Sequence, residues 1–322
     1  MKAVVADPVG GPENLKYVDV GKPEPNAGEV LVKIQAIGVN FIDVYFRTGL
    51  YKAPEAPVKI GSEAAGIVEA VGSGSRFRPG DRVAYAMARG SYAEYAVVPE
   101  AVLVHVPDDI TFEDAAALML QGMTAHYLTR STFPLSAGHT CLIHAAAGGV
   151  GLLLVQAAKI AGATVIGTVS TEEKARLVKQ HGADHVVRYT EEDFTKTAKT
   201  ITNGKGLDVV YDSVGSSTFF KSLDTLRPRG MMVSFGQSSG PVGPVDPLIL
   251  SQKGSLFLTR PSLANYVSDP KELAWRASDL FEWHRRGLLK LQIHRTYPLA
   301  EAANAHRELE SRASMGKLLL RP

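Results

Sequence analysis

A glycine-rich segment in the middle of the chain has the composition of a phosphate-binding loop. Residues 144–151 read His-Ala-Ala-Ala-Gly-Gly-Val-Gly, and Ala146, Gly148 and Gly151 fit the pattern Gly-x-Gly-x-x-Gly with alanine at its first position. Small residues let the backbone approach a pyrophosphate, and a helix N-terminus offers free N–H groups and a positive dipole end. A strand pattern precedes the segment, and a helix pattern and a second strand follow it. We therefore predict a dinucleotide-binding loop rather than an ordinary strand–helix turn.

The end of the second strand indicates which dinucleotide binds. An NAD site usually has an acidic residue there, which accepts a hydrogen bond from the ribose 2′-hydroxyl. This chain has Ser170 at that position and Lys174 one helical turn further on. A neutral serine does not repel a 2′-phosphate, so we predict NADP. In the alternative interpretation, Lys174 is an ordinary solvated helix lysine and Ser170 is the N-cap of the helix.

The elements that must position these residues differ between the first third of the chain and the rest. Short segments rich in β-branched and aromatic residues, punctuated by Gly and Pro, predict a barrel-like β domain at the start. The predicted strands are Lys2–Ala6, Leu15–Val20, Val30–Ile37, Ile67–Val71, Arg82–Tyr85 and Tyr92–Val98.

From Phe112 onward helix patterns enter, and from Thr140 onward strands and helices alternate, which predicts βαβ units and a parallel sheet covered on both faces. The predicted helices are Phe112–Leu120, Thr124–Thr129, Val150–Ala161, Glu172–His181, Glu191–Thr200, Ser217–Leu226, Leu273–Arg286 and Leu299–Ser311. The predicted strands are Thr140–His144, Thr164–Val169, His185–Val187, Leu207–Tyr211, Met231–Phe235, Leu289–Thr296 and Lys317–Leu320. The predicted fold class is α/β, with a β-rich domain and a doubly wound parallel-sheet domain.

Composition excludes several classes of protein. The 322 residues carry a formal charge of +2, 45% apolar residues and a single cysteine, Cys141. Global disorder, a disulfide scaffold and a nucleic-acid patch are therefore not expected. The longest apolar run, near Val150–Ala163, is short and contains Gln156 and Lys159, and Asp7 stops the opening apolar run. We expect a cytoplasmic protein that has no membrane segment.

The segment Gly61-Ser62-Glu63-Ala64-Ala65-Gly66 resembles the Gly-His-Glu-x-x-Gly signature of the medium-chain dehydrogenase/reductase superfamily. In the zinc alcohol dehydrogenases of that superfamily the histidine is a metal ligand, and here Ser62 takes its place. Catalytic zinc needs about three protein ligands. The part of the chain expected to form the catalytic domain has no cysteine. We predict that the protein has no metal site.

More of the chain resembles the zinc-free quinone oxidoreductases, the zeta-crystallin-like family, and most of all their bacterial NADPH:quinone reductase members. The matching segments are Ala36–Asp43, Arg47–Tyr51, His144–Gly151, Tyr211–Gly215 and Gly254–Pro261. The resemblance implies a GroES-like catalytic domain from residues 1–124 and 267–322 and a Rossmann NADP-binding domain from residues 125–266. It also implies a homodimer that pairs edge strands of the Rossmann domains, with Gly254–Thr259 as the edge.

The resemblance further implies the site residues. Asn40, Tyr45 and Tyr51 are the tentative catalytic residues, on the nicotinamide and quinone side. The implied NADPH-binding residues are Asn40, Phe41, Ile42, Asp43, Val44, Tyr45, Thr124, Tyr127, Gly148, Gly149, Val150, Gly151, Ser170, Lys174, Tyr189, Ser213, Phe235, Gly236, Ser238, Ser239 and Arg312. One departure is Gln121, where some relatives have lysine.

The sequence leaves three functions open. A quinone spreads the charge it receives over an aromatic ring, so hydride transfer from NADPH needs positioning and weak donors such as Tyr51 and Asn40. We therefore favour an NADPH:quinone reductase. An NADPH-dependent alkenal or enone reductase is the alternative on the same scaffold. A crystallin-like structural or RNA-binding protein is the third, and the near-zero charge and the phosphate loop argue against it.

Overall fold

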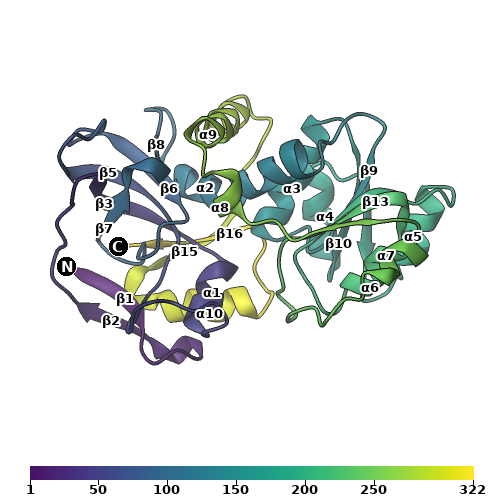
Figure 1. Cartoon of the computed structure of the whole chain (residues 1–322), viewed down its shortest axis with the longest axis horizontal. Coiled ribbons are helices and arrows are strands. Elements are labelled where there is room, and N and C mark those ends of the chain that lie inside the picture. Colours follow the sequence, from purple (N-terminus) through teal and green to yellow (C-terminus); the bar gives the residue numbers. More distant parts are fainter. The chain divides into compact units, whose positions relative to one another are not determined.

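The computed structural model describes all 322 residues, and they form two compact units. The β-rich unit comprises Met1–Met123, Tyr266–Arg286 and Leu291–Pro322, and the parallel-sheet unit comprises Thr124–Asn265 and Gly287–Lys290. Both ends of the chain belong to the β-rich unit (Figure 1). No helix is long and apolar enough to cross a membrane.

A seven-stranded, mainly antiparallel sheet is the centre of the β-rich unit. Its strands run in the order β15-β16-β3-β5-β6-β8, and β7 pairs with β3. They are β3 (Glu29–Val39), β5 (Glu63–Val71), β6 (Arg82–Ala86), β7 (Tyr95–Pro99), β8 (Leu103–His105), β15 (Ile293–Pro298) and β16 (Lys317–Arg321). A second sheet has the order β2-β1-β4, from β1 (Lys2–Ala6), β2 (Leu15–Asp19) and β4 (Val58–Lys59).

The core of the β-rich unit is built from apolar strand residues and is closed by the C-terminal strand. Val30, Val32 and Ile34 of β3 are buried in it together with Leu318 and Leu320 of β16. The helices of this unit are α1 (Phe41–Arg47), α9 (Pro270–Arg285) and α10 (Ala302–Glu310), with 3₁₀ turns at Pro12–Asn14, Glu100–Val102 and Leu299–Glu301. The short helix α8 (Leu263–Tyr266) begins in the parallel-sheet unit and ends at the first residue of this one. Helix α2 (Phe112–Tyr127) leads out of the unit along the chain and continues as a π-helical turn, Leu128–Thr132.

The parallel-sheet unit has six strands in the order β11-β10-β9-β12-β13-β14, all parallel. They are β9 (Thr140–Ile143), β10 (Thr164–Val169), β11 (His185–Arg188), β12 (Leu207–Asp212), β13 (Leu226–Ser234) and β14 (Phe257–Thr259). The helices between them are α3 (Gly149–Ile160), α4 (Glu172–Gln180), α5 (Phe194–Ile201), α6 (Phe219–Leu223) and α7 (Leu248–Gln252) (Figure 1).

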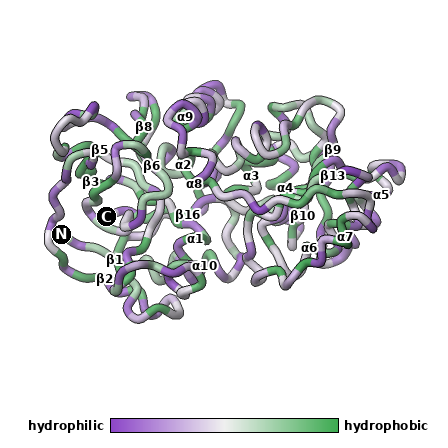
Figure 2. Tube along the Cα trace, viewed as in Figure 1, coloured by the Kyte–Doolittle hydropathy of each residue, from purple (hydrophilic) through white to green (hydrophobic).

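Helices cover both faces of the parallel sheet, as β10 illustrates. Ile166 lies in the core that Phe194 of α5 and Phe219 of α6 also enter. Its neighbour Gly167 faces the other way, where a Cβ would lie 2.9 Å from Val178 of α4. Successive strand residues point to opposite faces, so a strand buried on both sides must be apolar throughout. Figure 2 shows this hydrophobic course along the strands around β10 and β13.

The predicted α/β fold class is confirmed, and the elements correct several details. Thr164–Val169 is a strand with the predicted bounds. The two helices predicted at Phe112–Leu120 and Thr124–Thr129 are one helix, because Gly122 fits under Leu280 of α9 without interrupting it. Helix α1 was not predicted, since its sequence Phe-Ile-Asp-Val-Tyr-Phe-Arg is rich in residues that favour strands.

Candidate functional site

The predicted phosphate loop connects β9 to the N-terminus of α3. Gly148 is the N-cap of the helix, and its own N–H donates to Ala145 O at 2.9 Å. Ala145 is in the left-handed region with a φ of 51°. The N–H groups of Gly149, Val150 and Gly151 are in the first turn, where a helix offers no acceptor of its own. The loop therefore presents unpaired backbone donors at the positive end of the helix dipole.

Close packing explains why the loop needs small residues. A Cβ at Gly151 would lie 2.4 Å from Ala145 O, and one at Gly167 of β10 would lie 2.9 Å from the Ala146 Cβ. Both distances are shorter than van der Waals contact, so larger residues would push the loop away from the sheet. This cradle fits a dinucleotide pyrophosphate.

Three predicted adenosine-side residues lie together after β10. The Tyr189 N–H donates to Val169 O at 3.0 Å, which fixes the backbone of Tyr189 beside Ser170. The N-cap of α4 is Thr171, whose Oγ1 accepts from the Lys174 N–H at 3.3 Å. The alternative that Ser170 caps this helix is therefore wrong. Lys174 is half-buried, and its partial burial lowers the pKa of its ammonium group.

A further basic residue at this end of the sheet was missed by sequence reasoning. Arg188 ends β11, and its Nε lies 3.6 Å from Glu172 Oε2 while its NH2 lies 2.6 Å from Glu191 Oε2. The arginine partly neutralises the carboxylate of Glu172, which lies two residues after Ser170 in the sequence. The only sequence signal was its place directly before Tyr189.

The loops after β12 and β13 carry another group of predicted residues. Backbone hydrogen bonds join the two loops to each other. Ser238 N–H donates to Ser213 O at 3.1 Å. A Cβ at Gly236 would lie 2.6 Å from Ser213 O, so this approach requires glycine. Phe235 and Ser239 are held in the same way, by Asp212 O and Val214 O. These loops follow the carboxyl ends of parallel strands, where ligands of open α/β sheets bind.

His144 connects the phosphate loop to the interior of the parallel-sheet unit. Its Nδ1 lies 2.9 Å from Thr168 Oγ1 and its Nε2 lies 2.9 Å from Ser222 Oγ. The Ser222 hydroxyl donates to Thr218 O, so Nε2 carries the proton and Nδ1 accepts from Thr168. Burial lowers the pKa of His144 to about 4. The ring is thus neutral, and its two hydrogen bonds hold the phosphate loop in place. It carries no charge that could bind a phosphate.

Three of the predicted NADPH-binding residues lie outside the loops described above. Thr124 and Tyr127 lie three residues apart on α2, and both are buried. Arg312 lies in the β-rich unit, in the turn after α10, with a left-handed φ of 61° and an exposed side chain.

In the β-rich unit, α1 positions an aromatic cluster. The ring centroids of Tyr45 and Tyr51 are 5.2 Å apart, those of Phe46 and Tyr51 are 5.8 Å apart, and those of Phe41 and Tyr45 are 6.4 Å apart. Tyr51 follows the helix and is 36% exposed. Of the predicted residues here, Val44 is buried in the unit, whereas Phe41, Ile42 and Tyr45 keep part of their surface in solvent. The predicted catalytic tyrosines are therefore adjacent.

Asn40, the third predicted catalytic residue, is buried and fully hydrogen-bonded. Its Nδ2 donates to Glu63 Oε2 at 2.8 Å and to Gly38 O at 3.3 Å, and its Oδ1 accepts from Lys317 Nζ at 3.0 Å and Gln121 Nε2 at 3.1 Å. An amide has two donors and two acceptor sites. Asn40 thus has no free donor to offer a substrate, and its position favours an orienting role.

The centre of this buried polar cluster is an ion pair. Lys317 Nζ lies 2.5 Å from Glu63 Oε2, and both side chains are almost completely buried. The other Glu63 oxygen accepts from the Leu120 N–H. A Cβ at Gly38 would lie 2.0 Å from Glu63 Oε2 and 2.7 Å from Lys317 Nζ, so glycine makes room for the pair. Sequence reasoning did not single out Lys317.

Asp43 links the cluster to a second buried chain of polar groups. It accepts from the Asn40 N–H and from Ser62 Oγ, both at 2.9 Å, and from Tyr92 OH at 3.3 Å. Burial raises the pKa of Asp43 to about 7, against the opposing effect of these donors. Beyond it, Tyr92 OH lies 3.0 Å from His306 Nε2. A buried carboxyl that titrates near neutral pH thus lies on the same helix as Tyr45.

Arg47 connects this series of buried polar groups to the surface. Its NH1 donates to His306 Nδ1 at 3.3 Å, which leaves the ring proton on Nε2, facing Tyr92. The same guanidinium binds both oxygens of Glu310 at 2.8 Å. Burial and the neighbouring arginine lower the pKa of His306 to about 3. The ring is therefore neutral at physiological pH.

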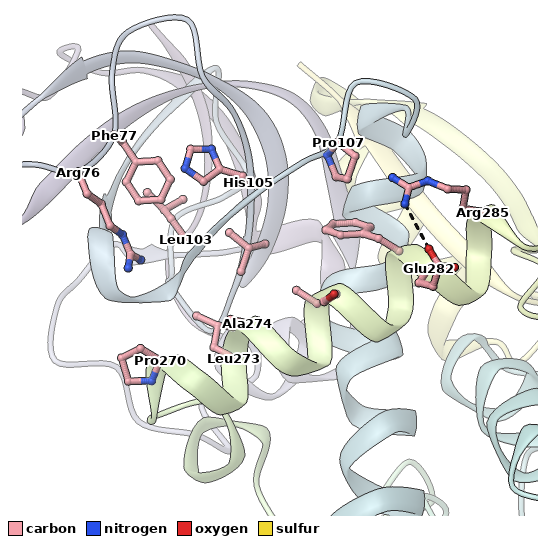
Figure 3. A pocket seen from close by; sticks show the side chains of 14 residues that line it. Arg76, Phe77, Leu103, His105, Pro107, Pro270, Leu273, Ala274, Glu282 and Arg285 are labelled. Atoms are coloured by element: carbon pink, nitrogen blue, oxygen red, sulfur yellow. Dashed lines mark hydrogen bonds and ion pairs between the residues drawn. The ribbon is translucent and has the colours of Figure 1, made fainter.

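A cavity in the β-rich unit is lined by none of the predicted site residues. No three His, Cys, Asp or Glu side chains are grouped so that they could hold a metal ion. A cavity of about 810 Å³ lies between α9 and β8, with Phe77, Leu103 and Phe281 in its walls (Figure 3). Its Arg285 is paired with Asp109 at 2.7 Å and with Glu282 at 3.3 Å. Its charges are thus already matched within the chain.

Comparisons with known proteins agree with the division of the chain. Residues 26–108 match the alcohol dehydrogenase GroES-like domain, and residues 149–268 match the zinc-binding dehydrogenase domain. A quinone oxidoreductase of Pseudomonas aeruginosa is 52% identical over 97% of both chains, and quinone oxidoreductase 1 of Escherichia coli is 47% identical over the same share. A 2-haloacrylate reductase of a Burkholderia species is 43% identical over 99% of this chain and 98% of its own.

Solved structures of related proteins are similar over the whole chain. The Escherichia coli quinone oxidoreductase complexed with NADPH superposes with a TM-score of 0.98 at 46% identity, and all of both chains is covered. A mycobacterial protein complexed with NADPH gives a TM-score of 0.97 at 47% identity, again over all of both chains.

Proposed function

The chain belongs to the quinone oxidoreductase family of medium-chain dehydrogenases/reductases, and we propose that it is an NADPH:quinone oxidoreductase. The observation that carries this proposal is near-full-length identity of 52% and 47% to proteins named quinone oxidoreductase. The neutral Ser170 and the half-buried Lys174 at the end of β10 support NADPH as the cofactor.

The chemistry follows from which groups are free and which are committed. Bound NADPH supplies a hydride, and one proton must reach the quinone oxygens as the aromatic hydroquinone forms. Tyr51 is exposed enough to donate a weak hydrogen bond to a quinone oxygen, and Tyr45 packs against it. Asn40 holds α1 in place through its four hydrogen bonds. Charge delocalised over the ring needs no strong acid, so positioning dominates.

The test is cofactor oxidation measured with matched substrates. NADPH consumption with a 1,4-benzoquinone should exceed that with an enone or with 2-haloacrylate by at least tenfold in kcat/KM. Faster turnover of the enone or haloacrylate would favour the alkenal and enone reductase alternative, to which the Burkholderia relative belongs by its name. RNA binding on a filter without NADPH oxidation would instead favour the crystallin-like alternative.

We further propose that catalysis is independent of zinc. Ser62 stands at the ligand position and its hydroxyl donates a hydrogen bond to Asp43, while the ammonium of Lys317 already balances the charge of Glu63. A dication beside that ammonium would be repelled. Dialysis against a chelator should leave kcat unchanged, and elemental analysis of active protein should find no stoichiometric zinc. Activity that a chelator removes and zinc restores would contradict the proposal.

The assembly and the location of the protein are also proposals. An apolar edge at β14 supports a homodimer, because Phe257 is 56% exposed and Leu258 is 38% exposed on the last strand of the sheet. A single, buried cysteine suits the reducing cytoplasm. We also propose that residues 1–124 and 267–322 act as the catalytic domain and that residues 125–266 bind NADPH.

A further inference from the structure

A surface segment that carries Tyr51 is fastened to the β-rich unit at both of its ends. Residues 48–57 follow α1 and contain neither helix nor strand. At the near end, the Tyr51 N–H donates to Tyr45 O at 3.0 Å. At the far end, Arg89 NH1 lies 2.8 Å from Glu55 Oε1, and Arg89 NH2 donates to Glu55 Oε2 at 3.2 Å. The ion pair thus holds the segment three residues before it enters β4, which is paired with β1.

Arg89 also contacts the aromatic cluster. Its guanidinium carbon lies 5.2 Å from the centre of the Phe46 ring, within the range of a cation–π interaction. The Phe46 ring meets the Tyr51 ring nearly edge-on, at 81°. One guanidinium therefore joins the segment that follows Tyr51 to the helix that precedes it.

The arginine stands on a firmly held turn. Met87 N–H donates to Ser62 O at 2.8 Å, and Gly90 N–H donates to Gly61 O at 2.9 Å. Both Met87 and Gly90 have left-handed φ values, of 70° and 96°, so the turn is tightly defined. Movement of the ion pair would therefore displace Glu55 and its segment rather than the turn.

We propose that Arg89 and Glu55 form a clamp that fixes Tyr51 and determines which quinones the enzyme accepts by size. This inference rests on the proposed function, since Tyr51 is expected on the quinone side. The two side chains are 26% and 34% exposed, so the pair is partly desolvated and accessible to salt. Both are positioning residues, because they act through the segment and not on the reacting atoms.

Arg89→Gln or Glu55→Gln releases the clamp. We expect the ratio of kcat/KM for 1,4-benzoquinone over 1,4-naphthoquinone to fall about threefold to tenfold, the range for a partly exposed pair with an added ring contact. The change should come from the quinone KM, and the NADPH KM should stay the same. In the unmodified enzyme, added salt should lower the ratio in the same direction.

A second readout does not depend on activity. Lys52 is exposed within the segment, so the rate of tryptic cleavage after it should rise in both single variants. The exchanged pair, Glu55→Arg with Arg89→Glu, should restore the resistance to trypsin and the quinone ratio. Lys22→Gln is the matched control, because Lys22 pairs with Glu69 at 2.7 Å and lies 4.1 Å from the Tyr95 ring.

The outcomes separate this inference from the proposed function. An unchanged quinone ratio in the single variants, or a change equal to that of Lys22→Gln, overturns the specificity role even if cleavage accelerates. Unchanged cleavage after Lys52 overturns the clamp itself. An unmodified chain that oxidises no NADPH with either quinone refutes the proposed function and the specificity role with it, while cleavage still reports on the clamp.

Discussion

We expect cofactor choice to depend on single residues at the end of β10. Lys174 can serve a 2′-phosphate as a point charge, and a charge-assisted hydrogen bond contributes about 1.5–3 kcal/mol, roughly ten- to a hundredfold in affinity. Lys174→Ala should therefore raise the NADPH KM by about that factor and leave the NADH KM nearly unchanged. Ser170→Asp should go further, because it repels the phosphate and accepts from the NADH ribose. The measurement is kcat/KM for both cofactors with one fixed quinone.

Two results would contradict this assignment of the pocket. One is equal use of NADH and NADPH by the unmodified enzyme. The other is a Lys174→Ala effect that both cofactors share. Lys179→Ala is the control, because Lys179 is an exposed lysine in the last turn of the same helix. It should change neither cofactor's KM.

Asp43 should make stability depend on pH. Its pKa is about 7 in the folded protein, against 3.8 for a free side chain. The folded state therefore binds more protons between about pH 4 and pH 7, so this group stabilises the fold fully below pH 4 and loses that contribution as pH rises to 7. We expect Asp43→Asn to remove a slope approaching 1.4 kcal/mol per pH unit within that window.

The measurement is the free energy of unfolding from urea titrations at several pH values, compared between the two proteins. His144 and His306 act in the opposite direction, because their lowered pKa values destabilise the fold as pH falls below about 6.5. The difference between wild type and variant cancels these histidines. A difference that is flat from pH 4 to pH 7 would show that Asp43 stays ionised.

At the scale of elements, strand β16 supplies a buried lysine, Lys317, that helps to hold the N-terminus of α1. Lys317 reaches from β16 to Glu63 and to Asn40, the N-cap of α1. Removing one partner of a buried ion pair typically costs about 3–5 kcal/mol, since the other charge is left uncompensated. Lys317→Met should therefore lower the free energy of unfolding by an amount in that range, measured by urea denaturation.

A double variant distinguishes a stranded charge from lost packing. Lys317→Met combined with Glu63→Gln removes both charges of the pair, so it should recover at least half of the lost stability. The exposed pair of Lys2 with Asp19 is the control, and Lys2→Met should leave the free energy of unfolding nearly unchanged. If the double variant is as unstable as the single one, the pair acts by shape alone.

The sequence predicted some elements well and others not at all, for physical reasons. The phosphate loop and Thr164–Val169 depend on neighbours in sequence, and both were predicted. Helix α1 was missed because its propensities favour a strand, although Asn40 followed by Asp43 three residues later is a capping signal. The pairing of Lys317 with Glu63 joins positions 254 residues apart, which no local pattern reveals.

At the scale of the molecule, the two units place different demands on the chain. The β-rich unit is made from both chain ends, and β16 pairs with β3 in its centre, so its sheet needs segments from both ends of the chain. The parallel-sheet unit is nearly continuous in sequence, from Thr124 to Asn265. Its sheet ends at β14, and the outer edge of that strand has no partner within the chain.

That outer edge should join two copies of the chain. An edge strand offers unpaired N–H and C=O groups, and a two-fold contact brings the same residues together from both copies. Leu258→Asp would therefore place two carboxylates close to each other and remove apolar burial, so we expect sedimentation at the mass of one chain instead of two. Phe220→Asp is the control on α6, where Phe220 is 46% exposed against 38% for Leu258, and it should leave the dimer intact. A single-chain mass for the unmodified protein, or a dimer that survives Leu258→Asp and dissociates with Phe220→Asp, would place the contact elsewhere.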